Sequence, residues 1–235
     1  MTLTDLEQIL KKYEDQLSES EKRELGAKLE LKTEAYPFNI YELRLSFLQE
    51  KNKLTFADYE FLRADYISSN KYLELYGLAP RIFGEIWGEK HIHSIDVRFL
   101  KASKVLDKNY DGEYDLWLDE LKIEVKSCRA IDSEIRGSLS SKALHSDEDR
   151  NFWMNFQQLK PDSCDYFIFI GVWVDRIRYW VLTAEEVKKN PYISHQHRDG
   201  IEYQIGITQK NINEFNKYLK KSTEIADYIL ELSQK

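Results

Sequence analysis

The chain has 235 residues, of which 42% are hydrophobic and 32% charged, a balance typical of a globular fold and not of a disordered chain. Its 34 basic and 41 acidic residues give a formal net charge of -7, which counts against a non-specific polyanion binder. The longest apolar run, residues 167–174, is too short to cross a bilayer, and no secretory signal is visible. Two cysteines cannot form a disulfide framework, so the composition excludes membrane, secreted-scaffold and fibrous proteins and predicts a cytoplasmic protein.

The N-terminal part of the chain has helical spacing. Residues 1–32 are charge-rich, and their apolar side chains recur three or four positions apart, which predicts a helix with one narrow apolar stripe. The stripe consists of Leu3, Leu6, Leu10, Tyr13 and Leu17. Further helices are expected at residues 40–51 and 55–75, the second capped by Thr55. We therefore predict an N-terminal helical region over residues 1–76, with a possible role in dimerisation or DNA contact.

The remaining residues, 77–235, alternate between helical and strand-like patterns. The expected helices cover residues 81–91, 151–159 and 184–190 and a C-terminal amphipathic segment with Ile212, Phe215, Leu219, Ala226 and Leu230. The expected strands cover residues 113–119, 121–128, 165–174, 177–182 and 201–207. Polar segments at 129–149 and 194–200 show no clear periodicity. This order predicts an α/β or α+β fold with a mixed, mainly antiparallel sheet flanked by helices.

Two carboxylates and a lysine stand out in the first pair of predicted strands. If a two-residue turn at 119–120 joins the strands, antiparallel pairing sets Asp115 opposite Glu124, with Cβ atoms about 4.5–5.5 Å apart. Lys126 projects from the same face, two residues beyond Glu124. The opposite face turns apolar side chains toward the core: Leu116, Leu118, Leu121, Ile123 and Val125.

Opposed carboxylates repel each other, and this arrangement calls for a compensating cation. Hard oxygen ligands suit Mg²⁺, which binds one or two protein carboxylates together with water and phosphate oxygens. Lys126 is placed to hold a water molecule or to stabilise negative charge on a phosphate, so the group suits metal-assisted hydrolysis of a phosphodiester. The alternative is an ordinary solvated hairpin face with a Glu124–Lys126 neighbour pair, because charged outer faces are common on antiparallel strands.

The spacing Asp115…Glu124-Val125-Lys126 resembles the bipartite motif of the PD-(D/E)XK nucleases, and residues 124–130 are similar to that motif in type II restriction endonucleases. The predicted helix at 84–89 resembles the upstream helix that often supplies another acidic residue in this family. The likeness extends in order over roughly residues 80–208.

The sequence departs from the family pattern at one position, because Tyr114 stands where the motif has a proline before the first acid. This departure leaves Asp111 as a rival to Asp115 for the role of the first acid.

The resemblance implies a restriction-endonuclease-like core over residues 77–235 and a Mg²⁺ cofactor. The implied metal ligands are Asp115, Glu124 and Val125. Lys126 would help to activate the attacking water, and Glu85 or Glu89 would complete the acidic cluster. Hydrolysis would leave a 5′-phosphate and a 3′-hydroxyl without a covalent enzyme intermediate.

These implications predict a Mg²⁺-dependent, sequence-specific double-stranded DNA endonuclease of the type II restriction class. A symmetric recognition sequence would make a homodimer the simplest assembly for cutting both strands. A cognate DNA methyltransferase is the expected partner in such a system. Two alternatives stay open: a structure-directed repair or recombination nuclease on the same fold, and a non-catalytic α+β binding module.

Contacts to DNA are expected from polar side chains that follow the candidate catalytic strand or occupy the late polar loop. Gln and Arg can each make two hydrogen bonds to a base edge, and basic side chains bind phosphates. The candidates are Arg129, Arg136, Lys142, Gln157, His195, Gln196, His197 and Arg198. Ordinary surface loops are the alternative for these segments. A zinc site is disfavoured, because neither closely spaced histidine pair has a second pair of ligands near it in the sequence.

Overall fold

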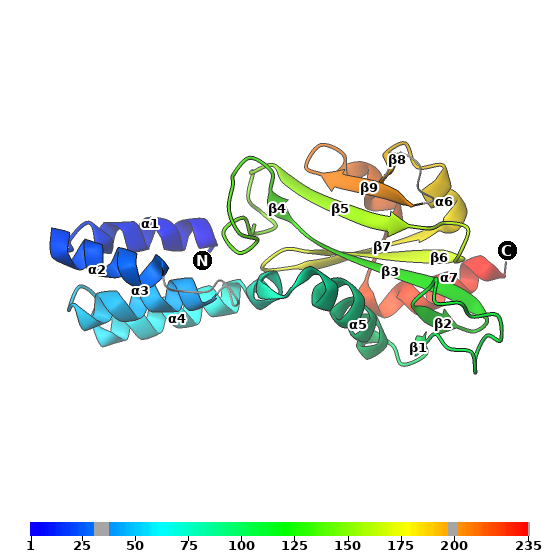
Figure 1. Cartoon of the computed structure of the whole chain (residues 1–235), viewed down its shortest axis with the longest axis horizontal. Coiled ribbons are helices and arrows are strands. Elements are labelled where there is room, and N and C mark those ends of the chain that lie inside the picture. The colour runs from blue at the N-terminus through cyan, green and yellow to red at the C-terminus, as the bar shows by residue number, and fades with distance from the viewer. Residues whose placement is uncertain (31–37, 197–201, 235) are drawn as a thin grey trace. The chain divides into compact units, whose positions relative to one another are not determined.

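The computed structural model describes residues 1–30, 38–196 and 202–234, and it has a mixed α/β fold (Figure 1). The chain divides into two units. The first unit consists of Met1–Leu78, Ile131–Arg150 and Trp173–Arg176, and the second of Ala79–Ala130, Asn151–Val172 and Ile177–Lys235. The sequence indicated the helical start of the first unit but not the two later segments that belong to it.

Helices make up the start of the first unit. They are α1 (Leu3–Glu14), α2 (Glu19–Glu30), α3 (Phe38–Glu50), α4 (Phe56–Ser69) and the 3₁₀ helix η1 (Leu73–Gly77). The prediction of a single helix over residues 1–32 is wrong, because Ser18 and Glu21 form a reciprocal cap that starts a new helix. The predicted cap of α4 is confirmed, since the Thr55 hydroxyl accepts a hydrogen bond from the backbone N–H of Asp58 at 3.1 Å.

The first unit is held together by the predicted leucine stripe in its core and by a partly exposed arginine with two carboxylate partners. The stripe leucines Leu3, Leu6, Leu10 and Leu17 are all buried. Arg44 lies between Glu7 and Glu14, with 2.7 Å between the guanidinium and a carboxylate oxygen of each. An arginine with two carboxylate partners fixes α3 against α1 in a defined register.

The two later segments of the first unit are tied together by backbone and side-chain hydrogen bonds. The backbone N–H of Val174 donates to the carbonyl of Leu144 at 3.0 Å, and the carboxylate of Asp175 accepts from the backbone N–H of Ser146 at 2.7 Å. The short strand β4 (Ile131–Asp132) begins the first of these segments. These bonds give residues 131–150 a fixed conformation although their sequence has no regular period.

The second unit is built on a six-stranded sheet in the order β1-β2-β3-β6-β7-β10. Its strands are β1 (Leu100–Lys101), β2 (Leu116–Leu118), β3 (Leu121–Arg129), β6 (Tyr166–Val172), β7 (Ile177–Thr183) and β10 (Leu219–Lys220). Strands β3 and β6 run parallel, and the other neighbouring pairs are antiparallel, which confirms the prediction of a mixed, mainly antiparallel sheet. Every residue of β6 is buried, as its continuous apolar sequence predicted.

A second layer of antiparallel strands covers one face of this sheet. It contains β5 (Phe152–Leu159), β9 (Tyr203–Thr208) and β8 (Ile193–His195), with β9 in the middle. The predicted helix at 151–159 is therefore wrong. Burial alternates along β5, and the ring of Phe156 stacks on that of Phe169 in β6 at 4.5 Å between centroids. The period of two in this segment is the strand signal that the helical interpretation overlooked.

Helices lie on the opposite side of the six-stranded sheet (Figure 1). They are α5 (Gly88–Ile95), preceded by the π-helical turn η2 (Ile82–Trp87), and α7 (Ile225–Ser233). Gly88 allows α5 to approach β3 closely, since a Cβ atom there would lie 2.3 Å from the Ser127 hydroxyl. The predicted helix at 81–91 is thus confirmed and extends to Ile95.

The C-terminal segment does not form the one amphipathic helix that the sequence predicted. It contains the 3₁₀ helices η3 (Ile212–Tyr218) and η4 (Ser222–Glu224), with β10 between them, before α7 begins. The helix is interrupted because Leu219 is extended and pairs with Trp180 of β7. The short helix predicted at 184–190 is confirmed as α6 (Ala184–Lys188).

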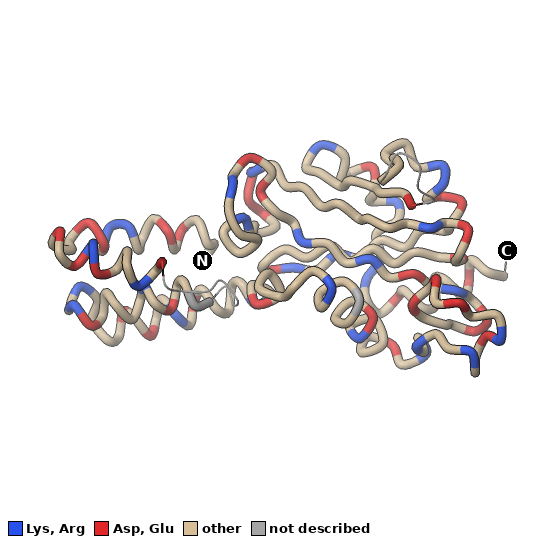
Figure 2. Tube along the Cα trace, viewed as in Figure 1, with Lys and Arg blue, Asp and Glu red and all other residues tan. Residues whose placement is uncertain are grey.

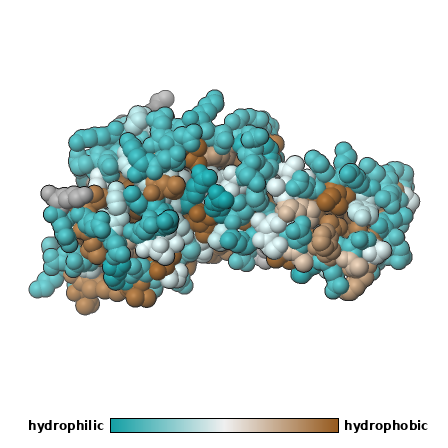
Figure 3. Space-filling model, turned by 180° about the vertical axis from the view of Figure 1, so that it is seen from behind, coloured by the Kyte–Doolittle hydropathy of each residue, from teal (hydrophilic) through white to brown (hydrophobic). Residues whose placement is uncertain are grey.

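Both the molecular surface and the described helices have the polar character that the composition predicts. Figure 3 shows hydrophilic residues over most of the rear face, with hydrophobic residues in separate patches. Within the described part of the chain, no helix combines the length and the apolar character that a membrane crossing requires.

Candidate active site

The β2–β3 hairpin has the register that the sequence predicted. Asp119 and Glu120 occupy the turn with φ values of 49° and 68°, which is the left-handed conformation of a two-residue hairpin turn. Leu118 pairs with Leu121 in the register that follows from this turn. One step beyond β2, the backbone N–H of Asp115 donates at 3.1 Å to the carbonyl of Ile123, which already pairs with Leu116, so the regular ladder ends before Asp115.

Asp115, Glu124 and Lys126 come together beyond the paired part of this hairpin. One carboxylate oxygen of Asp115 accepts a hydrogen bond from the backbone N–H of Val125 at 2.8 Å, and the Asp115 and Glu124 carboxyl groups are close enough to interact with each other. Lys126 Nζ lies 2.5 Å from Glu124 Oε1. Glu124 is only 8% exposed, and its other oxygen, Oε2, is buried without a hydrogen-bond partner among the described residues. A buried carboxylate oxygen without a partner is costly, and this cost is removed when the oxygen binds a cation.

The electrostatics of the pair reflect this burial. The pKa of Glu124 is raised from its ordinary 4.5 to about 8, mainly by burial and next by the negative charge of Asp115, while Lys126 acts in the opposite direction. Burial also raises the pKa of Asp115, against the hydrogen bond from Val125. Without a cation, Glu124 therefore tends to retain a proton near neutral pH. Two hard oxygen donors that need positive charge fit a Mg²⁺ ion, which binds few protein ligands.

These three residues line an open pocket of about 380 Å³ in the second unit. Further charged side chains around it come from α5, β1, the loop before β2 and the ends of β5 and β9: Glu89, Lys101, Glu113, Lys160 and Glu202. Figure 2 shows acidic and basic residues interspersed around the β2–β3 hairpin. A pocket with both signs of charge can hold a cation and an anionic group together.

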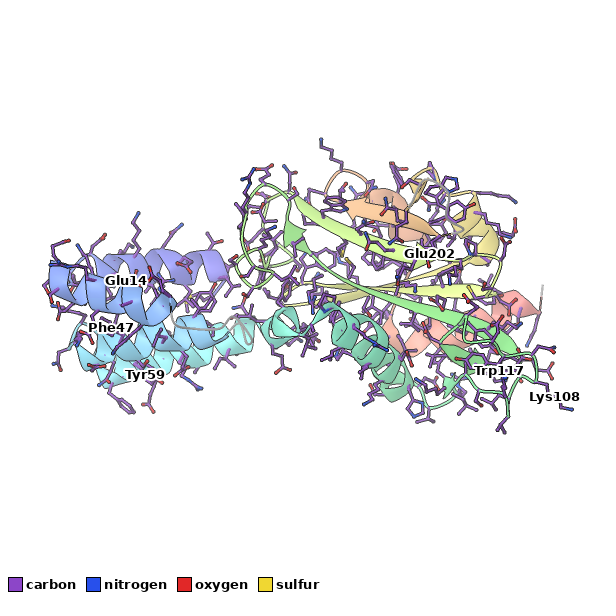
Figure 4. All side chains as sticks on the ribbon, viewed as in Figure 1. Glu14, Phe47, Tyr59, Lys108, Trp117 and Glu202 are labelled. Atoms are coloured by element: carbon purple, nitrogen blue, oxygen red, sulfur yellow. The ribbon has the colours of Figure 1, made fainter. Side chains whose placement is uncertain are left out.

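Two of the lysines at this pocket form ion pairs with carboxylates that also line it. Lys101 Nζ lies 2.7 Å from Glu89 Oε2, and Lys160 Nζ lies 2.7 Å from Glu113 Oε2. Glu202, labelled in Figure 4, lies 3.7 Å from Lys160 Nζ. In this arrangement a phosphate group can take the place of a carboxylate as the partner of a lysine.

The structure distinguishes among the acidic candidates that the sequence left open. Glu89 lines the pocket and is 14% exposed, whereas the side chain of Glu85 lies outside the described residues. Asp111 accepts a hydrogen bond from the backbone N–H of Glu113 at 3.2 Å and does not line the pocket. Asp115, and not Asp111, therefore lines the pocket together with Glu124.

The residues proposed for DNA contact are spread over several places. Arg129 is only 6% exposed and its guanidinium lies 3.9 Å from the centre of the Phe83 ring, a position that does not favour contact with DNA. Arg136 is exposed and Lys142 half-buried, and both belong to the first unit. The remaining candidates are Gln157 on β5, His195 and Gln196 at the end of β8, and His197 and Arg198, which lie outside the described residues.

Sequence reasoning missed Lys101, Gln158 and Lys160, which all line the pocket. Gln158 has a φ of 56° at a register shift in β5, and its backbone N–H donates to Gln196 Oε1 at 2.6 Å. Gln158 and Lys160 were overlooked because their segment was interpreted as a helix. A strand interpretation would have placed the end of β5 beside the hairpin.

The closely spaced histidines have other partners. His91 Nε2 lies 2.7 Å from the hydroxyl of Tyr179, and His93 Nδ1 lies 2.7 Å from the carbonyl oxygen of Phe99. Among the described residues, no group of three or more His, Cys, Asp or Glu side chains is arranged to hold a metal ion. The candidate cation site thus depends on the two carboxylates Asp115 and Glu124.

No protein-family model, curated protein or solved structure matches this chain. The interpretation of the pocket is therefore based on the positions of Asp115, Glu124 and Lys126.

Proposed function

We propose that the protein is a Mg²⁺-dependent, sequence-specific double-stranded DNA endonuclease of the type II restriction class, on a PD-(D/E)XK-like core. One observation carries this proposal. Asp115 and Glu124 line one open pocket at the β2–β3 hairpin, and Lys126 Nζ lies 2.5 Å from a Glu124 oxygen. The unpartnered second oxygen of Glu124 supports a cation between the two carboxylates.

Asp115 and Glu124 would hold the Mg²⁺ ion, with Val125 as the further ligand that the family resemblance implies. The ion supplies positive charge that offsets the negative charge of the phosphate under attack. Asp115 is oriented for this role by the hydrogen bond from the Val125 backbone N–H.

Lys126 has the chemistry of a group that positions water and stabilises charge. Its ammonium group is 20% exposed, so it is within reach of a substrate, and it can donate hydrogen bonds to a water molecule or to a phosphate oxygen. The oxygen of water attacks phosphorus in line, the P–O3′ bond breaks, and its electron pair stays on O3′, which takes up a proton. The products are a 5′-phosphate and a 3′-hydroxyl, and no Ser or Cys nucleophile takes part.

A homodimer is the assembly we propose, since two copies related by a two-fold axis can cut both strands of a symmetric site. A restriction function further implies a cognate DNA methyltransferase that protects the host DNA and a cytoplasmic location.

The first experiment compares wild-type protein with Glu124→Ala on unmethylated plasmid and phage DNA, with Mg²⁺ and with chelator. Discrete fragments from the wild type alone, and only with Mg²⁺, support a site-specific nuclease. A smear or nicked circles point to structure-directed or relaxed cleavage. If no DNA is cut under any of these conditions, the protein is not this nuclease, and a binding module becomes the better interpretation.

The second experiment tests the role of Lys126. Lys126→Ala is expected to reduce cleavage by roughly 100-fold or more while DNA affinity stays largely intact, because a positioned proton-transfer group contributes about that much. Lys122→Ala is the matched control, since Lys122 lies on the same strand but does not line the pocket. Full activity in Lys126→Ala would refute the assigned role.

A further inference from the structure

The outer face of the β5-β9-β8 layer carries an unusual set of side chains. Phe152, Met154 and Phe156 of β5 point inward and are buried. The intervening residues of β5 and the residues that pair with them on β9 and β8 share the other face. We call this set the amide face: Trp153, Asn155, Gln157, Ser194, Gln204 and Thr208.

The amide face is polar but carries no charged side chain, although 32% of the chain is charged. The solvated face of an antiparallel sheet is ordinarily polar, and here that polarity comes from amide and hydroxyl groups instead of charges. Trp153 at one end is 48% exposed, which is a large apolar surface to leave in water.

Three amide side chains meet at the centre of this face. Asn155 Nδ2 donates to Gln204 Oε1 at 3.0 Å, and Gln157 Nε2 lies 3.5 Å from the same oxygen. Each amide has two N–H donors and one carbonyl acceptor, so these bonds leave hydrogen-bonding capacity on the cluster. Gly206 pairs with Asn155 across the strands, and a Cβ atom there would lie 3.4 Å from Trp153 Nε1, so the indole ring lies beside this glycine.

The amide face continues into the candidate active site. The residue after Gln157 is Gln158, at the register shift of β5, and it lines the catalytic pocket together with Lys160. The backbone N–H of Gln158 donates a hydrogen bond to the side chain of Gln196, and this bond stabilises the backbone at the register shift. A duplex with one phosphodiester at Asp115 and Glu124 would therefore have its neighbouring bases within reach of the amide face.

We propose that the amide face reads base edges in the major groove of duplex DNA, with adenine as the preferred base. Asn and Gln make paired hydrogen bonds to N6 and N7 of adenine, and the major groove admits a two-stranded β-ribbon. The absence of charge suits contact with base edges, whereas phosphates are left to the lysines of the pocket. This inference rests on the proposed nuclease function and names the surface that gives it sequence specificity.

The test uses Glu124→Gln protein, which binds without cutting, to select duplexes from a pool with a randomised central segment. We expect a discrete motif that contains at least one A·T pair. Added Gln204→Ala or Gln157→Ala should reduce the preference at an A·T position by roughly 10-fold or more, because a paired amide–adenine contact discriminates to about that degree. Gln157 is exposed, so its replacement leaves the fold intact even if Gln204→Ala disturbs it.

The control is Asn216→Ala, which removes an exposed amide from η3 of the same unit and should leave the motif unchanged. Selection of no motif, or of the same motif with the same preferences by every variant, would overturn the inference.

The outcome is separable from that of the proposed function. A wild type that cuts at a site unaffected by Gln157→Ala and Gln204→Ala retains the nuclease function without this reading surface. A selected motif that shifts in the variants, without any cleavage by the wild type, retains the reading surface without the nuclease.

Discussion

Replacing Glu124 with glutamine should stabilise the metal-free protein, and increasingly so as the pH rises. The pKa of Glu124 is raised from 4.5 in an unfolded chain to about 8 in the folded protein. Between these values the folded state keeps a proton that the unfolded state has released, so the wild type loses stability as the pH rises. At about 1.4 kcal/mol per pH unit, the free energy of unfolding should fall by roughly 3 kcal/mol relative to Glu124→Gln between about pH 5 and pH 8.

The measurement is urea denaturation of both proteins at several pH values in the presence of chelator. Four of the five tryptophans, Trp87, Trp117, Trp153 and Trp180, belong to the second unit, so fluorescence reports mainly on the unit that contains Glu124. Glu120→Gln removes a carboxylate from the exposed turn of the same hairpin and serves as the control. A constant difference between wild type and Glu124→Gln across this range would show that burial does not raise the pKa of Glu124, and would remove the argument for a cation at this position.

Two further predictions concern the fold. Gly171→Ala should destabilise the second unit by about 1–3 kcal/mol, because its Cβ would lie 2.6 Å from a Trp180 ring carbon in a packed core. Urea denaturation measures this loss, and Gly26→Ala is the control, because it has open space in α2 and should be neutral or stabilising. Ser18→Ala should cost about 1 kcal/mol and reduce the helical circular dichroism, because it removes one half of the cap at the start of α2; unchanged stability would show that α2 begins without this cap.

The candidate site could be predicted because it depends on local geometry. A two-residue turn fixes the register of a hairpin, and this register predicts that Asp115 and Glu124 lie near each other with Lys126 on the same side. The pairing of Leu118 with Leu121 confirms this register. Two other local patterns, a capping residue and a continuous apolar run, identified the Thr55 cap and the buried strand β6.

The errors arose where local patterns compete or where distant contacts decide. The segment 151–159 has apolar residues that fit a helix loosely, but its alternation fits a strand, and packing of Phe156 against Phe169 favours the strand. Ser18 followed by Glu21 is a capping pattern that the sequence itself contains, and it predicts the start of α2. The inclusion of residues 131–150 in the first unit depends on contacts with distant segments, and no local pattern encodes it.

The charge of the pocket is compatible with the proposed action of an acidic protein on DNA. The described residues that line it include five carboxylates, on Glu89, Glu113, Asp115, Glu124 and Glu202, against three lysines, on Lys101, Lys126 and Lys160. This formal excess of two negative charges would repel a phosphate, and one divalent cation is sufficient to cancel it. The net charge of -7 therefore argues against metal-independent binding of polyanions and not against a metal-dependent nuclease. In such a site the cation makes the lysines available to the phosphate, so binding of the metal and binding of the substrate depend on each other.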